Sequence, residues 1–216
     1  IVPFVNIQGL KETTHGKGEI EDLNRCFNDN SIEEVDVINK LVDEVDFVID
    51  LHTHRSTTTK TYAVVIDKTA TTKESLKLAS CFGIKNVELA DPIELKDRLA
   101  GTLFFSAAKK GKPNIVIEMN NVDCMSGKEI HILSRRFLDL NTRFLKRNIS
   151  TKNLTICKPV KSKFDTLITK INLKLGNLVN KNQIIASVIN LKSNKPVDIR
   201  SLTNGRIVSL PKREVF

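Results

Sequence analysis

Polar side chains that could do chemistry stand at the ends of two apolar, β-branched runs. One run enters Asp50-Leu51-His52-Thr53-His54, and the other, Ile115-Val116-Ile117, ends in Glu118. Buried strands of this kind deliver polar groups to the sheet edge where open α/β folds keep their sites. An imidazole can hold zinc, which lowers the pKa of a bound water, and a nearby carboxylate can take the proton and pass it to a leaving amine. The residues alone also allow a structural histidine and a Glu118 paired with a basic neighbour.

A third group is the pair Asn24-Arg25, which lies in a loop next to Asp22. The preceding stretch is polar and is broken by Gly16 and Gly18. A guanidinium is a planar, two-pronged donor and an amide adds a third donor, so the pair is suited to clamping a carboxylate. Most Asn-Arg pairs in loops are solvated, however, so the spacing alone leaves both interpretations open.

The elements that must position these groups alternate between strands and helices over the first two thirds of the chain. Hydrophobic periodicity and capping signals, such as the capping box Ser31-Ile32-Glu33-Glu34, predict the helices. This alternation implies an α/β fold with a mainly parallel, mixed sheet covered by helices on both faces. The predicted strands are 2–6, 46–52, 62–66, 86–89 and 113–118, and the predicted helices are 31–44, 71–82, 92–99, 104–110 and 126–147.

The pattern changes near residue 150. From there to the end, short β-rich runs, of which Leu154–Cys157 is the first, are separated by turn signals such as Asn204-Gly205. We therefore predict two domains, an α/β domain at 1–149 and a small all-β domain at 150–216.

The composition limits the classes of protein. No apolar run approaches the roughly 20 residues of a membrane span, and the four cysteines are widely spaced, which favours reduced thiols in a cytoplasm over metal clusters or disulfides. The net charge is +9, yet acidic residues dominate the first 50 positions. The lysines beyond Ser150 are scattered among apolar strand residues without interleaved aromatics, which favours a solvated face over a nucleic-acid surface.

Taken together, the motifs resemble the succinylglutamate desuccinylase/aspartoacylase family of the zinc carboxypeptidase superfamily. The segment Asp22-Leu23-Asn24-Arg25-Cys26-Phe27 is similar to that family's Asp-Leu-Asn-Arg-x-Phe motif, and Asp50-Leu51-His52-Thr53 to its Asp-Leu-His-Thr motif. Val2–Asn6 resembles its Pro-Asn strand, and Pro113–Glu118 resembles the strand that carries its catalytic glutamate. The runs from Gly176 to Ala186 and from Ser201 to Val208 resemble its barrel-like C-terminal domain.

The resemblance implies a zinc-dependent hydrolase that cleaves the amide of an N-acyl amino acid or similar small acidic substrate, or an ester, by metal-activated water. It implies that His52 is a ligand of one zinc ion, that Glu118 is the base and then the acid, and that Asn24 and Arg25 clamp the substrate carboxylate. We expect a cytoplasmic protein whose partner is a small molecule, not a membrane or nucleic acid. Its oligomeric state is left open.

The family takes its other two zinc ligands from a His-Gly-x-Glu motif upstream of the Pro-Asn strand, and this chain begins after that point. His15-Gly16-Lys17-Gly18-Glu19 has the right residue types, but the spacing is one residue too long and the place in the chain differs. Because the first residue is Ile, we expect an N-terminally truncated hydrolase domain whose activity as given is very low. The alternatives are a degenerate, non-catalytic relative without zinc and, less favoured, a basic protein associated with nucleic acid.

Overall fold

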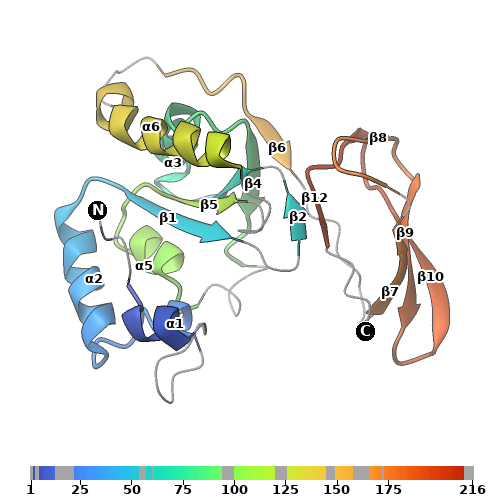
Figure 1. The fold of residues 1–216 in the computed structure, drawn as a ribbon, viewed down its shortest axis with the longest axis horizontal. Coiled ribbons are helices and arrows are strands. Elements are labelled where there is room, and N and C mark those ends of the chain that lie inside the picture. Colours follow the sequence, from blue (N-terminus) through green and yellow to red (C-terminus); the bar gives the residue numbers. More distant parts are fainter. Residues whose placement is uncertain are drawn as a thin grey trace.

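The computed structural model describes Val2 and residues 5–12, 22–53, 57–59, 61–93, 100–119, 126–144, 149–157, 166–171 and 173–211. Figure 1 shows helices stacked around a central sheet, with a β-rich C-terminal segment beside them. No described helix combines the length and the apolar character that crossing a membrane requires.

The central sheet has five strands in the order β1-β5-β3-β4-β6. Neighbouring strands are parallel, except that β3 and β5 run antiparallel. This arrangement confirms the predicted mainly parallel, mixed sheet. The strands are β1 (Val48–Thr53), β3 (Tyr62–Ile66), β4 (Asn86–Ala90), β5 (Asn114–Met119) and β6 (Thr155–Cys157).

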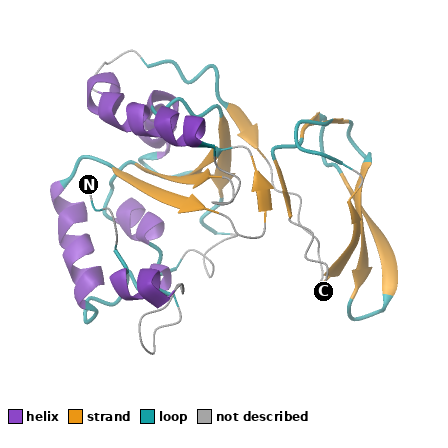
Figure 2. Ribbon diagram, in the orientation of Figure 1, coloured by secondary structure: helices purple, strands orange, loops and turns teal. Residues whose placement is uncertain are grey.

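Helices cover both faces of this sheet, as Figure 2 shows. On one side lie α3 (Thr72–Cys81) and α6 (Gly127–Phe144), and on the other lie α1 (Ile7–Glu12), α2 (Glu33–Glu44) and α5 (Leu103–Lys109). The predicted helix at 92–99 falls almost wholly outside the described residues.

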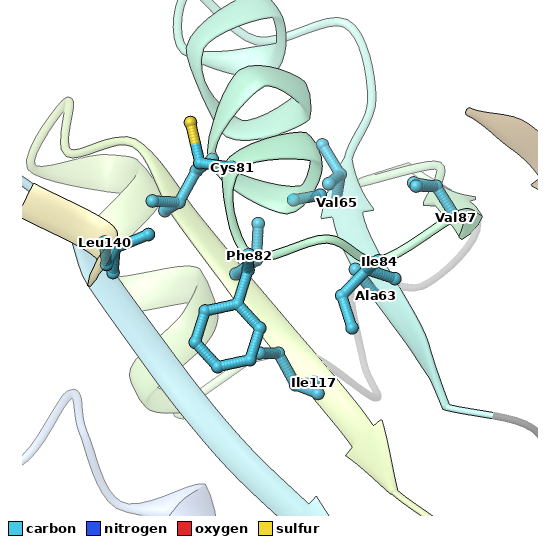
Figure 3. Packing of buried hydrophobic residues seen from close by; sticks show 11 residues of the cluster. Ala63, Val65, Cys81, Phe82, Ile84, Val87, Ile117 and Leu140 are labelled. Carbon is cyan, nitrogen blue, oxygen red and sulfur yellow. The ribbon is translucent and has the colours of Figure 1, made fainter. Parts of the chain in front are cut away.

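The main core lies between the sheet and the pair α3 and α6. Ile115 and Ile117 of β5 are fully buried there against Phe82, which follows α3. Figure 3 shows the Phe82 ring next to Ile117, with Leu140 of α6 nearby. A second cluster joins α2 and α5 to Val48 of β1. Val116, on the other face of β5, packs with Phe104 of α5 in a third cluster. Apolar packing therefore holds both faces of β1 and β5 just before their C-terminal ends.

The C-terminal segment is all-β over its described residues. A three-stranded antiparallel sheet has the order β10-β9-β7, and two ribbons pair β11 with β8 and β12 with β2. The ribbon of β12 and β2 joins the end of the chain to the segment that follows β1. The strands are β2 (Thr57–Thr59), β7 (Thr166–Ile171), β8 (Leu178–Val179), β9 (Ile184–Asn190), β10 (Lys195–Arg200), β11 (Gly205–Arg206) and β12 (Ser209–Pro211).

Strand β6 differs from the sequence prediction. Leu154–Cys157 was expected in the C-terminal β domain, but β6 pairs in parallel with β4 and forms an end of the central sheet. A run of three residues cannot indicate which sheet it joins, because the pairing is decided by contacts distant in sequence. The boundary near residue 149 stays a prediction.

Two helix starts also differ from the prediction. Asn6 was expected in a strand, but it precedes α1, and its side-chain oxygen accepts a hydrogen bond from the Gly9 N–H at 2.8 Å. Asparagine is a preferred residue at this capping position. The prediction of a capping box that begins at Ser31 was wrong. Helix α2 begins at Glu33, and its N-cap residue, Ile32, makes no side-chain cap hydrogen bond. The Ser31 N–H is instead bonded to the Asp29 carboxylate at 3.0 Å.

Candidate active site

His52 and Glu118 lie opposite each other on neighbouring strands. In the parallel register of β1 and β5, His52 pairs with Glu118, one residue before each strand ends. Residues that are directly opposite on adjacent strands project from the same face of a sheet. The structure therefore brings the imidazole and the carboxylate to one face at one edge of the sheet.

Asp50 holds the His52 ring. The two residues are separated by one position in β1 and share a face, and His52 Nε2 lies 3.0 Å from Asp50 Oδ2. The Asp50 side chain is 18% exposed and that of His52 is 36% exposed. A carboxylate only accepts hydrogen bonds, so this contact assigns the hydrogen to Nε2 and leaves the lone pair of the neutral ring on Nδ1. No role for Asp50 was predicted from the sequence, although its spacing from His52 could have suggested one.

The charges around His52 shift its pKa. Burial lowers the pKa, but the hydrogen bond to Asp50 and the negative charges of Asp50 and Glu118 outweigh burial, so that the pKa of His52 lies above its ordinary value. The positive charge of Arg25 acts in the lowering direction. The site thus stabilises the protonated imidazole when no metal is bound.

Replacing Asp50 with asparagine should lower the pKa of His52 in the metal-free protein. A raised folded-state pKa contributes stability that is present below the ordinary pKa of about 6.5 and is lost as the pH rises through the folded-state pKa. In Asp50→Asn the negative charge that raises the His52 pKa is gone, so the lowering effect of burial weighs more. The loss of stability with rising pH should therefore become smaller. An NMR titration of the His52 ring measures the shift, with the exposed Asp46→Asn as control. An unchanged His52 pKa would contradict the role of Asp50.

The Asn24-Arg25 pair sits on a short 3₁₀ helix, η1 (Leu23–Arg25). The Asp22 carboxylate accepts a hydrogen bond from the Asn24 N–H at 2.9 Å and caps this turn. Leu23 and Phe27 are buried in the cluster between α2 and α5 and anchor it. The turn was predicted only as a loop, because two apolar anchors in six residues are too few to indicate a helix.

Asn24 reaches His52 while Arg25 faces solvent. Asn24 Nδ2 lies 3.4 Å from His52 Nε2. Arg25 Nη1 donates to the Asn24 carbonyl oxygen at 2.7 Å and lies 3.7 Å from Asp22 Oδ2, with 53% of the side chain exposed. The structure therefore groups all four candidate residues, since Asn24 contacts His52 and the charges of Arg25 and Glu118 both act on it.

Of the four histidines, His52 and His131 lie in the described part of the chain. His131 is exposed on α6. His54 and the segment from His15 to Glu19 lie outside the described residues. A hollow of about 1030 Å³ between β4, β6 and the C-terminal strands is lined by Tyr62, the antiparallel partner of Glu118, but neither His52 nor Glu118 is among its lining residues in the described part of the chain.

The described residues supply only part of a zinc site. A catalytic zinc ordinarily takes three protein ligands and a water. His52 suits one ligand position, because its Nδ1 keeps a lone pair while Nε2 is held by Asp50. Among the residues that the structure describes, no group of three His, Cys, Asp or Glu side chains is placed to hold a metal ion. These residues by themselves therefore do not fit a complete zinc site.

Comparison with known proteins identifies the family. The sequence model of the protein family described as succinylglutamate desuccinylase/aspartoacylase catalytic domain matches residues 1–142 of this chain. A search of curated protein sequences finds no match. Among solved structures, the product-bound ectoine utilization protein EutE (DoeB) from Ruegeria pomeroyi is 19% identical with a TM-score of 0.73, and the match covers 99% of this chain and 70% of that chain.

Two further structures have the same fold. A succinylglutamate desuccinylase from Silicibacter sp. TM1040 is 16% identical with a TM-score of 0.69, and the match covers 98% of this chain and 69% of that one. An aspartoacylase family protein from Mesorhizobium loti is 17% identical with a TM-score of 0.68, over 99% of this chain and 69% of that one. The family predicted from the motifs is thereby confirmed, and the chain belongs to the succinylglutamate desuccinylase/aspartoacylase family of deacylases.

Proposed function

We propose that this protein is a zinc-dependent hydrolase that cleaves the amide of an N-acyl amino acid or a similar small acidic substrate, or an ester. The observation that carries the proposal is the pairing of His52 with Glu118 across β1 and β5, with Asn24 in contact with the imidazole. In this proposal the proton acceptor Glu118 and the hydrogen-bond donor Asn24 act beside the same imidazole, as amide hydrolysis of an acidic substrate requires.

In this proposal Glu118 moves the proton. Its carboxylate accepts a proton from the attacking water and later delivers it to the nitrogen of the leaving amine. The donors of Asn24 and Arg25 bind the substrate carboxylate, and the exposure of Arg25 suits it to meet a ligand that arrives from solvent. Acidic substrates are favoured, because the amide nitrogen of Asn24 and the guanidinium of Arg25 are hydrogen-bond donors, which bind the oxygens of a carboxylate.

The proposed cofactor is one zinc ion, with His52 as a ligand. A zinc ion held there would lower the pKa of a bound water and would act as a Lewis acid toward the substrate carbonyl. Asp50 orients the imidazole for this task through its hydrogen bond to Nε2. We further propose a cytoplasmic location, in which the free thiols of Cys26, Cys81 and Cys157 would stay reduced, and we propose no membrane or nucleic-acid partner.

The test is release of free amino acid from N-succinyl-glutamate and from N-acyl aspartates, followed by NMR. We expect the protein supplied with zinc to release the amino acid, and the release to stop when a chelator is added. Binding of these compounds without any release would identify a non-catalytic relative and overturn the proposal.

A further inference from the structure

A buried glycine lies directly against the backbone of the Asn24-Arg25 pair. Gly101 has φ +78°, and a Cβ there would collide with the Arg25 carbonyl oxygen and come within 2.6 Å of its carbonyl carbon. The Gly101 carbonyl oxygen in turn accepts a hydrogen bond from the Phe27 N–H at 2.7 Å. The segment before α5 therefore packs backbone against backbone on the turn that carries Asn24, which only a residue without a side chain permits.

The same segment orients the Asn24 side chain. The N–H of Leu103, the first residue of α5, donates to Asn24 Oδ1 at 3.0 Å. N–H groups in the first turn of a helix have no partner within the helix. Thr102 caps the Phe105 N–H with its hydroxyl at 3.2 Å, so the Leu103 N–H remains for Asn24. With Oδ1 held in this way, the amide nitrogen Nδ2 must point toward His52, where it lies 3.4 Å from Nε2.

This orientation decides which chemistry Asn24 offers. Nδ2 carries two hydrogens and no lone pair. The Nε2–H of His52 is directed to Asp50 at 3.0 Å, so the imidazole presents no acceptor to Asn24. The hydrogens of Nδ2 thus point into the site, and the imidazole that they face offers them no acceptor. An oxygen of a bound carboxylate or carbonyl would accept hydrogen bonds from them.

We infer that Gly101 and the backbone N–H of Leu103 are positioning groups, which hold the Asn24 carboxamide with its nitrogen, rather than its oxygen, toward the site. The inference rests on the proposed function only for the identity of the oxygen that Asn24 binds. It assigns a specificity that a reversed amide would invert, because a reversed Asn24 would present an acceptor and repel a carboxylate.

The experiment compares two glycine variants of the 216-residue chain. Gly111 is the matched control for Gly101, because it also has a positive φ of 70°, but a Cβ added there would meet no other described part of the chain within 4 Å. We expect Gly101→Ala, but not Gly111→Ala, to shift the NMR signals of the Leu103 amide and of the Asn24 side-chain amide. Equal signals in the two variants would overturn the inference.

Substitution of Asn24 separates the two ends of its amide. Asn24→Asp keeps an oxygen for the Leu103 N–H but replaces the donor with a charged acceptor, so we expect hydrogen-exchange protection of Leu103 to persist while N-acetyl-L-aspartate binds about 10-fold to 100-fold more weakly. Asn24→Ala should lose both the hydrogen-exchange protection of the Leu103 N–H and the affinity for N-acetyl-L-aspartate. These variants decide the matter if Gly101→Ala does not fold. Undiminished protection of Leu103 in Asn24→Ala would overturn the inference.

Failure of the proposed function gives a different result. If the unsubstituted chain does not bind N-acetyl-L-aspartate at all, the proposed substrate class is wrong. The Leu103 and Asn24 signals still decide whether the carboxamide is held as inferred, because they are measured without ligand.

Discussion

Replacing Glu118 with glutamine should lower the rate constant kcat for N-acyl amide hydrolysis by roughly 10²-fold to 10⁴-fold. Glutamine keeps the size of the side chain but cannot accept a proton from water or return one to the leaving amine. The residue lies opposite His52 in the register of β1 and β5, so its loss removes the proton carrier from the site. Steady-state kinetics of the protein supplied with zinc measures the change.

The control for this variant is Glu44→Gln, which changes an exposed glutamate at the end of α2. It should leave kcat unchanged while altering the net charge by the same amount. A Glu118→Gln protein that hydrolyses as fast as the unsubstituted protein would exclude Glu118 as the base. An equal loss of activity in both variants would point to an effect of charge rather than to proton transfer.

Replacing Phe82 with alanine should lower the free energy of unfolding by about 3–5 kcal/mol. The ring is fully buried, and it meets Phe137 edge-on with centroids 4.7 Å apart. Its removal leaves a cavity beside Ile115 and Ile117 of β5, the strand that carries Glu118. Urea unfolding followed by circular dichroism gives the change.

Leu138→Ala provides the comparison, since this side chain is 82% exposed on α6, next to Phe137 in sequence. We expect it to change the free energy of unfolding by less than about 1 kcal/mol. If Phe82→Ala costs no more than Leu138→Ala, the described core does not depend on Phe82.

Most elements of the α/β part could be predicted from the sequence. Apolar, β-branched runs gave β1, β3, β4 and β5 within one or two residues, because burial on both faces leaves a pattern that solvent-exposed segments lack. The order of the strands could not be predicted. β5 lies between β1 and β3, and such pairing depends on contacts between residues far apart in the chain. The adjacency of His52 and Glu118 was therefore a hypothesis until the register was known.

The supporting residues of the site were harder to predict than the candidate residues themselves. Asp50 could be placed on the face of His52 from its spacing, but not in a hydrogen bond, because that depends on the rotamers of both side chains. Gly101 carries no local signal at all, since the atoms that require a glycine belong to Arg25. Sequence motifs mark the groups that face the ligand, whereas the groups that hold them are recognised only from the packing.

The most direct test of the proposed zinc site is an X-ray structure of the protein crystallised with zinc, with anomalous data collected at the zinc edge. We expect a zinc peak about 2.0–2.1 Å from Nδ1 of His52, with Nε2 still bonded to Asp50 and the Glu118 carboxylate on the same face of the sheet. A structure in which His52 and Glu118 project from opposite faces, or in which zinc binds elsewhere and leaves His52 uncoordinated, would contradict it.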